Sequence, residues 1–262
     1  MEHIRSAVRK AKKKVAFLGR KTSGANCLRY LLSRSDVDVV LVVTVPKGYE
    51  GWWGEDEVYE IATRNGIDVV GEDEQDKILE YDIDLIISVL YPRKVHKRVL
   101  DHAKLGGINL HAGPLPHYRG THLYSHAILN GERKYGAALH YMDADFDTGP
   151  IIEIKWFDLR PDITAGELRE CTEKAWYDLL VKHLSNILNG SVIAIPQEQI
   201  IKTEGIKPHY YHKISLSNRQ VDLRWEPQKI YDFVRALQFG PSEVESRAYI
   251  KLDAYKFYLS IK

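Results

Sequence analysis

Short apolar runs recur along the first half of the chain, and the stretches between them have the spacing of amphipathic helices. The strands expected from these runs cover residues 15–18, 37–44, 67–70, 84–90 and 107–111. The helices between them are expected to end near Ser35 and to cover residues 55–64 and 94–104. Strands that alternate with helices form a parallel sheet with both faces covered. The pattern therefore predicts an α/β fold with a mostly parallel sheet.

The pattern changes in the second half. Residues 137–142 and 151–157 are apolar strands with no helix between them, which predicts an antiparallel addition to the sheet. Residues 164–188 have the spacing of a long helix, and Thr164 and Glu167 form a capping signal at its start. After Gly190 we expect short strands over 192–195, 220–225 and 249–259, and one helix over 227–237. The predicted domains are a basic extension (1–13), a main domain (14–204) and a small β-rich C-terminal subdomain (205–262).

Charge and cysteine content limit the partners and the cellular compartment expected for the protein. Lys and Arg total 37 and Asp and Glu total 36, so the net charge is +1 and lacks the basic excess expected of a nucleic-acid or membrane binder. Cys27 and Cys171 show no metal-binding spacing, which favours a reduced, cytoplasmic setting. No apolar run approaches the roughly 20 residues of a membrane span. The basic start is expected to be a solvated helix or tail, or else a contact to an anionic ligand or partner.

Two polar segments interrupt the apolar pattern. In GINLHAGPLPHYRG (107–120), Asn109 and His111 lie two apart on a predicted strand, so they share a face near its carboxyl end, where open parallel sheets bind ligands. In DADFDTGP (143–150), three acidic residues fall in one turn between two strands. Each segment also has a structural interpretation, because an Asn–His pair forms local hydrogen bonds and Asp-rich turns are common at surfaces.

Together these segments resemble the signature of the formyltransferases that use 10-formyltetrahydrofolate. The matching residues are Asn109, His111, Leu115-Pro116, Arg119-Gly120 and Asp147-Thr148-Gly149-Pro150, and the resemblance covers most of residues 14–190. It implies a Rossmann-like catalytic domain and 10-formyltetrahydrofolate as the formyl donor. It also implies a pterin pocket walled by Leu90, Tyr91, Pro92, Arg93, Lys94 and Val95 on one side and by Met142, Asp143, Ala144, Asp145 and Phe146 on the other.

The resemblance assigns catalysis to Asn109, His111 and Asp147. Formyl transfer needs a group that carries a proton, a hydrogen-bond donor to the oxyanion, and a group that orients the proton carrier. A histidine has a pKa near neutrality, which suits His111 as the general base toward the amine. The Asn109 amide would donate to the oxyanion, and Asp147 would orient the imidazole. We expect no metal.

The C-terminal segments PHYYHKISLSNRQVDLRW and IYDFVRALQFGP resemble the end of the nucleotide-sugar N-formyltransferases. Those enzymes formylate dTDP- or UDP-linked amino sugars for surface polysaccharide, and many are homodimers. The resemblance is strongest to the dTDP-sugar enzymes. We therefore predict a nucleotide-sugar acceptor, no nucleic-acid or membrane partner, and a homodimer. Expected substrate-binding residues are Arg119, Tyr210, Tyr211 and Lys213.

Three alternatives remain open. A methionyl-tRNA formyltransferase shares the catalytic signature but resembles this chain less at the C-terminal end. A formyltetrahydrofolate hydrolase would use the same three residues to activate water. A nucleotide-sugar-binding protein without catalysis would have no need of all three.

Overall fold

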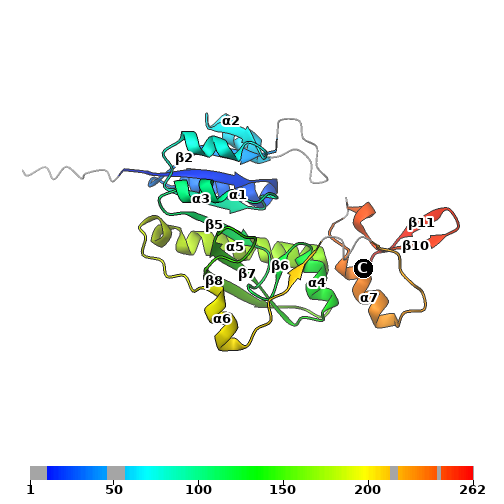
Figure 1. Cartoon of the computed structure of the whole chain (residues 1–262). Coiled ribbons are helices and arrows are strands. Elements are labelled where there is room, and N and C mark those ends of the chain that lie inside the picture. Colours follow the sequence, from blue (N-terminus) through cyan, green and yellow to red (C-terminus); the bar gives the residue numbers. More distant parts are fainter. Residues whose placement is uncertain (1–10, 46–56, 213–217, 241–242, 262) are drawn as a thin grey trace, which may run out of the picture. The chain divides into compact units, whose positions relative to one another are not determined.

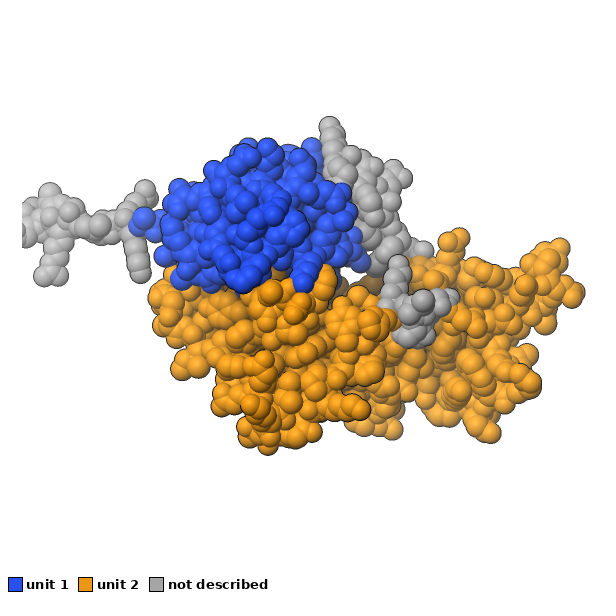
Figure 2. Space-filling model, viewed as in Figure 1, with its two compact units in different colours: residues 1–49, 56–107 blue, residues 50–55, 108–262 orange. Residues whose placement is uncertain are grey.

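The computed structural model describes residues 11–45, 57–212, 218–240 and 243–261. The chain divides into two compact units, which Figure 2 colours separately. The first comprises residues 1–49 and 56–107, and the second comprises residues 50–55 and 108–262. This division falls inside the predicted main domain, so the boundary expected near residue 205 stays a prediction.

The first unit is a parallel α/β unit. Its strands, in spatial order, are β3 (Asp68–Gly71), β2 (Val37–Thr44), β1 (Lys13–Gly19) and β4 (Leu85–Val89), and every pairing among them is parallel. Its helices are α1 (Lys21–Ser33), α2 (Glu57–Arg64), the 3-10 helix η1 (Gln75–Glu80) and α3 (Lys97–His102). All five residues of β4 are buried, as expected of a strand covered on both faces. The predicted mostly parallel α/β fold is confirmed.

The second unit contains the antiparallel strands β5 (Gly107–His111), β7 (Lys134–Tyr141) and β8 (Ile151–Asp158). Helix α4 (Leu123–Leu129) precedes β7, and the long helix α5 (Ala165–Leu188) packs across β7 and β8 (Figure 1). The capping box of Thr164 and Glu167 starts α5, as predicted. In the described part of the chain, neither α5 nor any other helix is long and apolar enough to cross a membrane.

The C-terminal part of the second unit begins after α5. Its elements are α6 (Gln197–Glu204), β9 (Tyr210–Tyr211), α7 (Pro227–Ala236), the 3-10 helix η3 (Val244–Ser246), β10 (Tyr249–Leu252) and β11 (Tyr255–Tyr258). Strand β9 pairs in parallel with the short strand β6 (Arg119–Gly120). A separate core forms around α7 from Val221, Phe233, Val234, Leu237 and Ala248. The predicted small β-containing C-terminal region is therefore present.

Several C-terminal expectations were wrong in detail. Residues 192–195 and 220–225 are not strands but make one bridge each, Ile195 to Ile151 and Gln220 to Tyr249. Residues 249–259 form a hairpin rather than one strand, because the chain reverses at Asp253, whose φ is +53°. Helices α4 and α6 were missed, since seven or eight residues carry too few turns for a clear period.

Candidate active site

Strand pairing puts Asn109 and His111 on β5 beside β7. Asn109 lies opposite His140, and His111 lies opposite Ala138. His111 is only 5% exposed, and its backbone carbonyl accepts a hydrogen bond of 2.7 Å from the indole N–H of Trp176 on α5. A core contact therefore fixes the strand at His111.

Both ring nitrogens of His111 face acceptors. Nδ1 lies 3.1 Å from Asp147 Oδ1, and Nε2 lies 2.6 Å from the carbonyl oxygen of Tyr118. A neutral imidazole donates through one nitrogen only, so this geometry fits an imidazolium that donates through both. Burial by itself lowers the pKa of His111, but the charge and hydrogen bond of Asp147, together with the Tyr118 carbonyl, outweigh it and raise the pKa.

Asp147 holds this ion pair from a left-handed backbone conformation. Its φ is +60°, and its Oδ2 accepts a hydrogen bond of 2.8 Å from the backbone N–H of Gly120. Burial by itself raises the pKa of Asp147, but the His111 charge and the hydrogen bonds from His111 and Gly120 lower it to about 2. The structure thus brings His111 and Asp147 together as a buried, charged pair.

The sequence analysis missed His140, which joins this cluster from β7. Its Nδ1 lies 2.7 Å from the Tyr141 carbonyl and must donate there, so its Nε2 accepts from the Asn109 amide at 3.1 Å. Burial and the nearby His111 charge lower the pKa of His140 to about 4, which keeps the ring neutral. This contact orients the Asn109 amide, whose second N–H has no partner among the described residues. A histidine in the apolar run 137–142 was the available signal.

The ligand-type atoms of His111, His140 and Asp147 lie within 4.8 Å of one another. Two imidazoles and a carboxylate resemble the donor set of a divalent cation. A metal ligand must be deprotonated, however, and His111 as placed has acceptors at both nitrogens. The arrangement favours protons over a cation, and the absence of a metal stays a prediction.

The first predicted pterin wall, residues 90–95, lies in the first unit. Leu90 has a φ of +58°, and its carbonyl accepts from Arg20 Nε at 3.2 Å. The Tyr91 hydroxyl donates to the Glu72 carbonyl at 2.7 Å, and the buried Gln75 side chain donates to the Lys94 carbonyl at 3.0 Å. Arg20 and Gln75, which precede this segment in the sequence, therefore fix its backbone. A binding site that uses backbone groups needs a backbone fixed in this way.

The second predicted wall, residues 142–146, lies in the second unit. Asp143 Oδ1 accepts from the Thr148 hydroxyl at 2.5 Å and from the Asp145 N–H at 3.1 Å. The segment closes where the Tyr141 N–H donates to the Pro150 carbonyl at 2.9 Å, and Phe146 is exposed. Both walls are ordered turns, and their contact to a pterin stays a prediction.

The predicted substrate residues differ in their surroundings. Arg119 donates through Nη2 and Nε to Gln197 Oε1, at 2.6 and 3.2 Å. Tyr210 is 39% exposed, and burial together with the charge of Asp147 raises its pKa. Both residues therefore neighbour the His111–Asp147 pair. Lys213 lies outside the described residues.

Tyr211, predicted to bind the substrate, contacts three rings of the protein itself. Its ring stacks on Tyr118 at 5.0 Å and also contacts His126 and His209, at 4.4 and 4.3 Å. Its hydroxyl accepts from the Asn130 amide at 2.8 Å. These contacts pack the Tyr211 ring within the protein, and its role in substrate binding stays a prediction.

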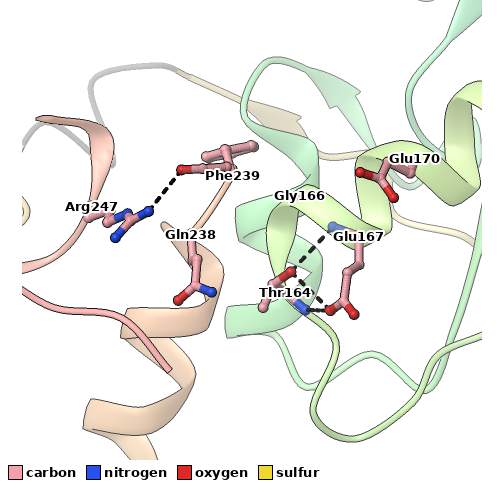
Figure 3. A pocket seen from close by; sticks show the side chains of 8 residues that line it. Thr164, Gly166, Glu167, Glu170, Gln238, Phe239 and Arg247 are labelled. Atoms are coloured by element: carbon pink, nitrogen blue, oxygen red, sulfur yellow. Dashed lines mark hydrogen bonds between the residues drawn. The ribbon is translucent and has the colours of Figure 1, made fainter. Parts of the chain in front are cut away.

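A surface pocket lies elsewhere in the second unit, where the start of α5 meets residues 238–247 (Figure 3). It is lined by Thr164, Gly166, Glu167, Glu170, Gln238, Phe239, Gly240 and Arg247. Arg247 donates to the Gly240 carbonyl at 3.0 Å. The predicted site residues are not among those that line it.

Comparison with known proteins identifies the family of this chain. Residues 13–184 match the family described as formyl transferase. A methionyl-tRNA formyltransferase of Clostridium acetobutylicum is 32% identical, over 87% of this chain and 74% of that protein.

Two solved structures share the fold. One is a 4-N formyltransferase from Francisella tularensis, with a TM-score of 0.79, 18% identity, and coverage of 95% of this chain and 97% of that one. The other is the Helicobacter canadensis N-formyltransferase in complex with folinic acid and dTDP-3-aminofucose, with a TM-score of 0.69, 23% identity, and coverage of 86% and 80%. The family match spans more than half of the chain and contains all three predicted catalytic residues, and so this chain belongs to the formyl transferase family.

Proposed function

We propose that this enzyme transfers the formyl group of 10-formyltetrahydrofolate to the amino group of a nucleotide-linked, most readily dTDP-linked, amino sugar. The observation that carries the proposal is the cluster of Asn109, His111 and Asp147, in which one amide N–H and one charged imidazole–carboxylate pair meet in a buried site. An oxyanion donor and a proton carrier are the two groups that acyl transfer to an amine requires. The folate supplies the formyl group as donor substrate.

The hydrogen bonds of the resting site suggest an order of proton transfers. His111 starts as an imidazolium with both N–H groups bound to protein acceptors, so one N–H must leave its acceptor before it gives a proton to the departing folate nitrogen. The neutral ring then takes the proton released by the attacking amine. Asp147 stabilises the charged form at both ends of this cycle. The second N–H of Asn109, oriented by His140, donates to the oxyanion. His111 thus acts as the predicted base only after acting as an acid.

Three features favour a sugar acceptor over tRNA. The structures that share the fold include the Helicobacter canadensis N-formyltransferase in complex with dTDP-3-aminofucose. The net charge of +1 lacks the excess that many phosphate contacts demand. The half-exposed Tyr210 beside the catalytic pair offers a ring to a nucleotide or sugar. The 32% identity to the tRNA enzyme keeps initiator tRNA as the second candidate.

The test is a panel of nucleotide-linked amino sugars incubated with 10-formyltetrahydrofolate and read by mass gain on the sugar. Charged initiator tRNA is assayed in parallel at low and physiological salt. We expect one sugar to gain a formyl group, with an acceptor KM that rises only modestly with salt. Formylation of tRNA that is lost steeply as salt rises would reject the sugar acceptor, because tRNA binding scales with the number of phosphates contacted. Formate release without any acceptor would indicate the hydrolase.

The cellular setting and assembly belong to the same proposal. We place the enzyme in the cytoplasm as a homodimer that serves surface-polysaccharide synthesis. Size-exclusion chromatography with light scattering measures the assembly directly, and a monomer at micromolar concentration would remove the dimer from the proposal.

A further inference from the structure

The side chain of Gln197 makes hydrogen bonds at every position it offers. Its Nε2 donates to the backbone carbonyls of Asp147 and Gly149, at 2.9 and 2.8 Å, and its Oε1 accepts twice from Arg119. Gln197 is 3% exposed. A buried amide with two donors and two acceptor contacts satisfied has a fixed orientation. Gln197 therefore joins the backbone of the Asp147 turn to the Arg119 side chain.

The fold presents Gln197 to this turn by a specific route. Ile195 and Ile151 exchange two backbone hydrogen bonds of 2.8 and 2.9 Å at the start of β8, and Pro196 then begins α6 with Gln197 as its first residue. One turn later, Ile200 packs on the buried cluster of Leu115, Ala138 and Ile151. Residues three apart share a helix face, so this packing holds Gln197 toward the site.

The turn at Asp147 and Gly149, whose carbonyls accept from Gln197, needs support from its surroundings. Asp147 holds a positive φ, a conformation that non-glycine residues keep only when their surroundings impose it. Gly149 approaches the Tyr141 carbonyl so closely that a Cβ at this position would overlap it. The turn is therefore tight on the strand side, and the Gln197 amide holds its carbonyls from the other side.

We propose that Gln197 is a positioning residue. By donating hydrogen bonds to the backbone carbonyls of Asp147 and Gly149, it holds the Asp147 carboxylate within hydrogen-bond distance of His111 Nδ1. Asp147 reaches His111 and Gly120 N–H with its two carboxylate oxygens, at 3.1 and 2.8 Å, so a rotation of the turn breaks both contacts together. Arg119, at the other end of the amide, links this turn to β6. The inference rests on the proposed catalytic role of the His111–Asp147 pair, not on the identity of the acceptor.

The state of His111 reports on this positioning without any substrate. Because Asp147 favours the charged imidazole, a displaced carboxylate moves the His111 titration to lower pH. Arg119 from β6 and His140 from β7 act on the pair, Asp143 from the turn acts on His140, and Tyr210 from β9 lies within the field of Asp147. Removing the Arg119 charge moves the His111 titration in the opposite direction, to higher pH, so the two contacts of Gln197 are distinguishable.

The experiment is an NMR pH titration of histidine-labelled protein, with His111 assigned by its absence from the His111→Gln spectrum. Gln197→Met keeps the length of the side chain and removes the amide, and Gln197→Asn keeps the amide but shortens it. Gln199→Met is the matched control, since Gln199 is exposed on the same helix. Arg119→Met removes only the other partner. Thermal unfolding and, with the acceptor identified, kcat and KM complete the measurements.

We expect both Gln197 variants to lower the His111 midpoint by about one pH unit or more. We also expect them to lower kcat by about 10-fold to 100-fold with a smaller change in KM, since a misplacement of about 1 Å can cost about 10² in rate. Gln199→Met should change neither, and Arg119→Met should not lower the midpoint. An unchanged His111 midpoint in both Gln197 variants, with a lowered melting temperature, would reduce Gln197 to a structural role and overturn the proposal. If no sugar is formylated, the acceptor proposal fails while the titration still decides this one.

Discussion

Two segments carry the resemblance of this chain to formyltransferases, and they use their polar side chains differently. In the predicted catalytic segment, between Asn109 and Asp147, side chains pair with one another and with backbone, and one amide N–H is left without a partner among the described residues. In the C-terminal segment RALQFG, at residues 235–240, Gln238 pairs with backbone, and Arg235 pairs with the Asp232 carboxylate as well as with backbone. Arg235 is 7% exposed and donates to the Ile163 carbonyl at 2.8 Å.

The C-terminal segment packs the C-terminal region against the start of α5. The Gly166 N–H donates to the Gln238 carbonyl at 2.9 Å, and a Cβ at Gly166 would overlap the Phe239 carbonyl oxygen. Arg169 adds an ion pair of 3.0 Å with Glu243. The motif match thus points to predicted catalytic residues in the first segment and to packing residues in the C-terminal segment. The hydrogen-bond partners of the polar atoms distinguish the two cases.

The largest effect should come from the catalytic segment. Asn109→Ala removes the oxyanion donor and should lower kcat by about 10² or more, and His111→Ala removes the proton carrier and should lower it at least as much. Steady-state kinetics measure the loss. Asn26→Ala, an exposed change on α1, is the control for expression and folding. Near-normal turnover in either variant would remove that residue from the mechanism.

The docking segment should affect stability instead. Gly166→Ala forces the backbone of Phe239 away from α5 and should lower the free energy of unfolding by about 3 kcal/mol, at the upper end of overpacking costs. Arg235→Met leaves the Ile163 carbonyl without its donor and should cost about 2 kcal/mol. Urea unfolding measures both changes. The exposed Arg224→Met should be nearly neutral, and equal losses at Arg224 and Arg235 would contradict the docking role.

The two buried histidines of the catalytic segment should respond to pH with opposite signs. Burial and the nearby charge of His111 lower the pKa of His140 to about 4, below an unfolded value of about 6.5, so stability is present above pH 6.5 and is lost as pH falls toward 4, by at most about 3 kcal/mol. The raised pKa of His111 contributes stability below about pH 6.5 that is lost at higher pH.

Unfolding free energies measured between pH 4 and 8 test this difference. His140→Gln should flatten the acid side of the profile, because the buried ring that resists protonation is gone. His117→Gln, a change at an exposed position, should leave the profile unchanged. An acid slope that persists in His140→Gln would assign the acid sensitivity to other groups.

The smallest effect concerns the acceptor. Tyr210→Ala should raise the acceptor KM about fivefold and leave kcat within about twofold, because the loss of one stacking ring costs about 1 kcal/mol of binding. Tyr255→Ala, on the exposed hairpin of the same region, is the matched control. An unchanged KM in Tyr210→Ala would assign Tyr210 to the support of β9 alone.

The sequence by itself determined the parallel strands and singled out the residues predicted to be catalytic. Buried parallel strands read as continuous apolar runs, so 37–44 and 84–90 stood out without any partner being known. The two-residue spacing placed Asn109 and His111 on one face of a strand, and only the resemblance implied a catalytic role for them. Asp147 followed from the resemblance, since its contact with His111 joins residues 36 positions apart.

Only the tertiary structure decided what each polar atom binds. His140 carries only the weak local signal of a histidine in an apolar run, and Gln197 carries none, because the partners of His140 come from strand pairing and those of Gln197 from the packing of a short helix. The packing of Tyr211 depends on Tyr118 and His126, which lie far from it in the sequence, as well as on its neighbour His209. The charged state of His111 depends on two acceptors that a strand pattern does not contain. Periodicity reports which face of an element is buried, whereas hydrogen-bond partners distant in sequence are fixed only when the elements pack.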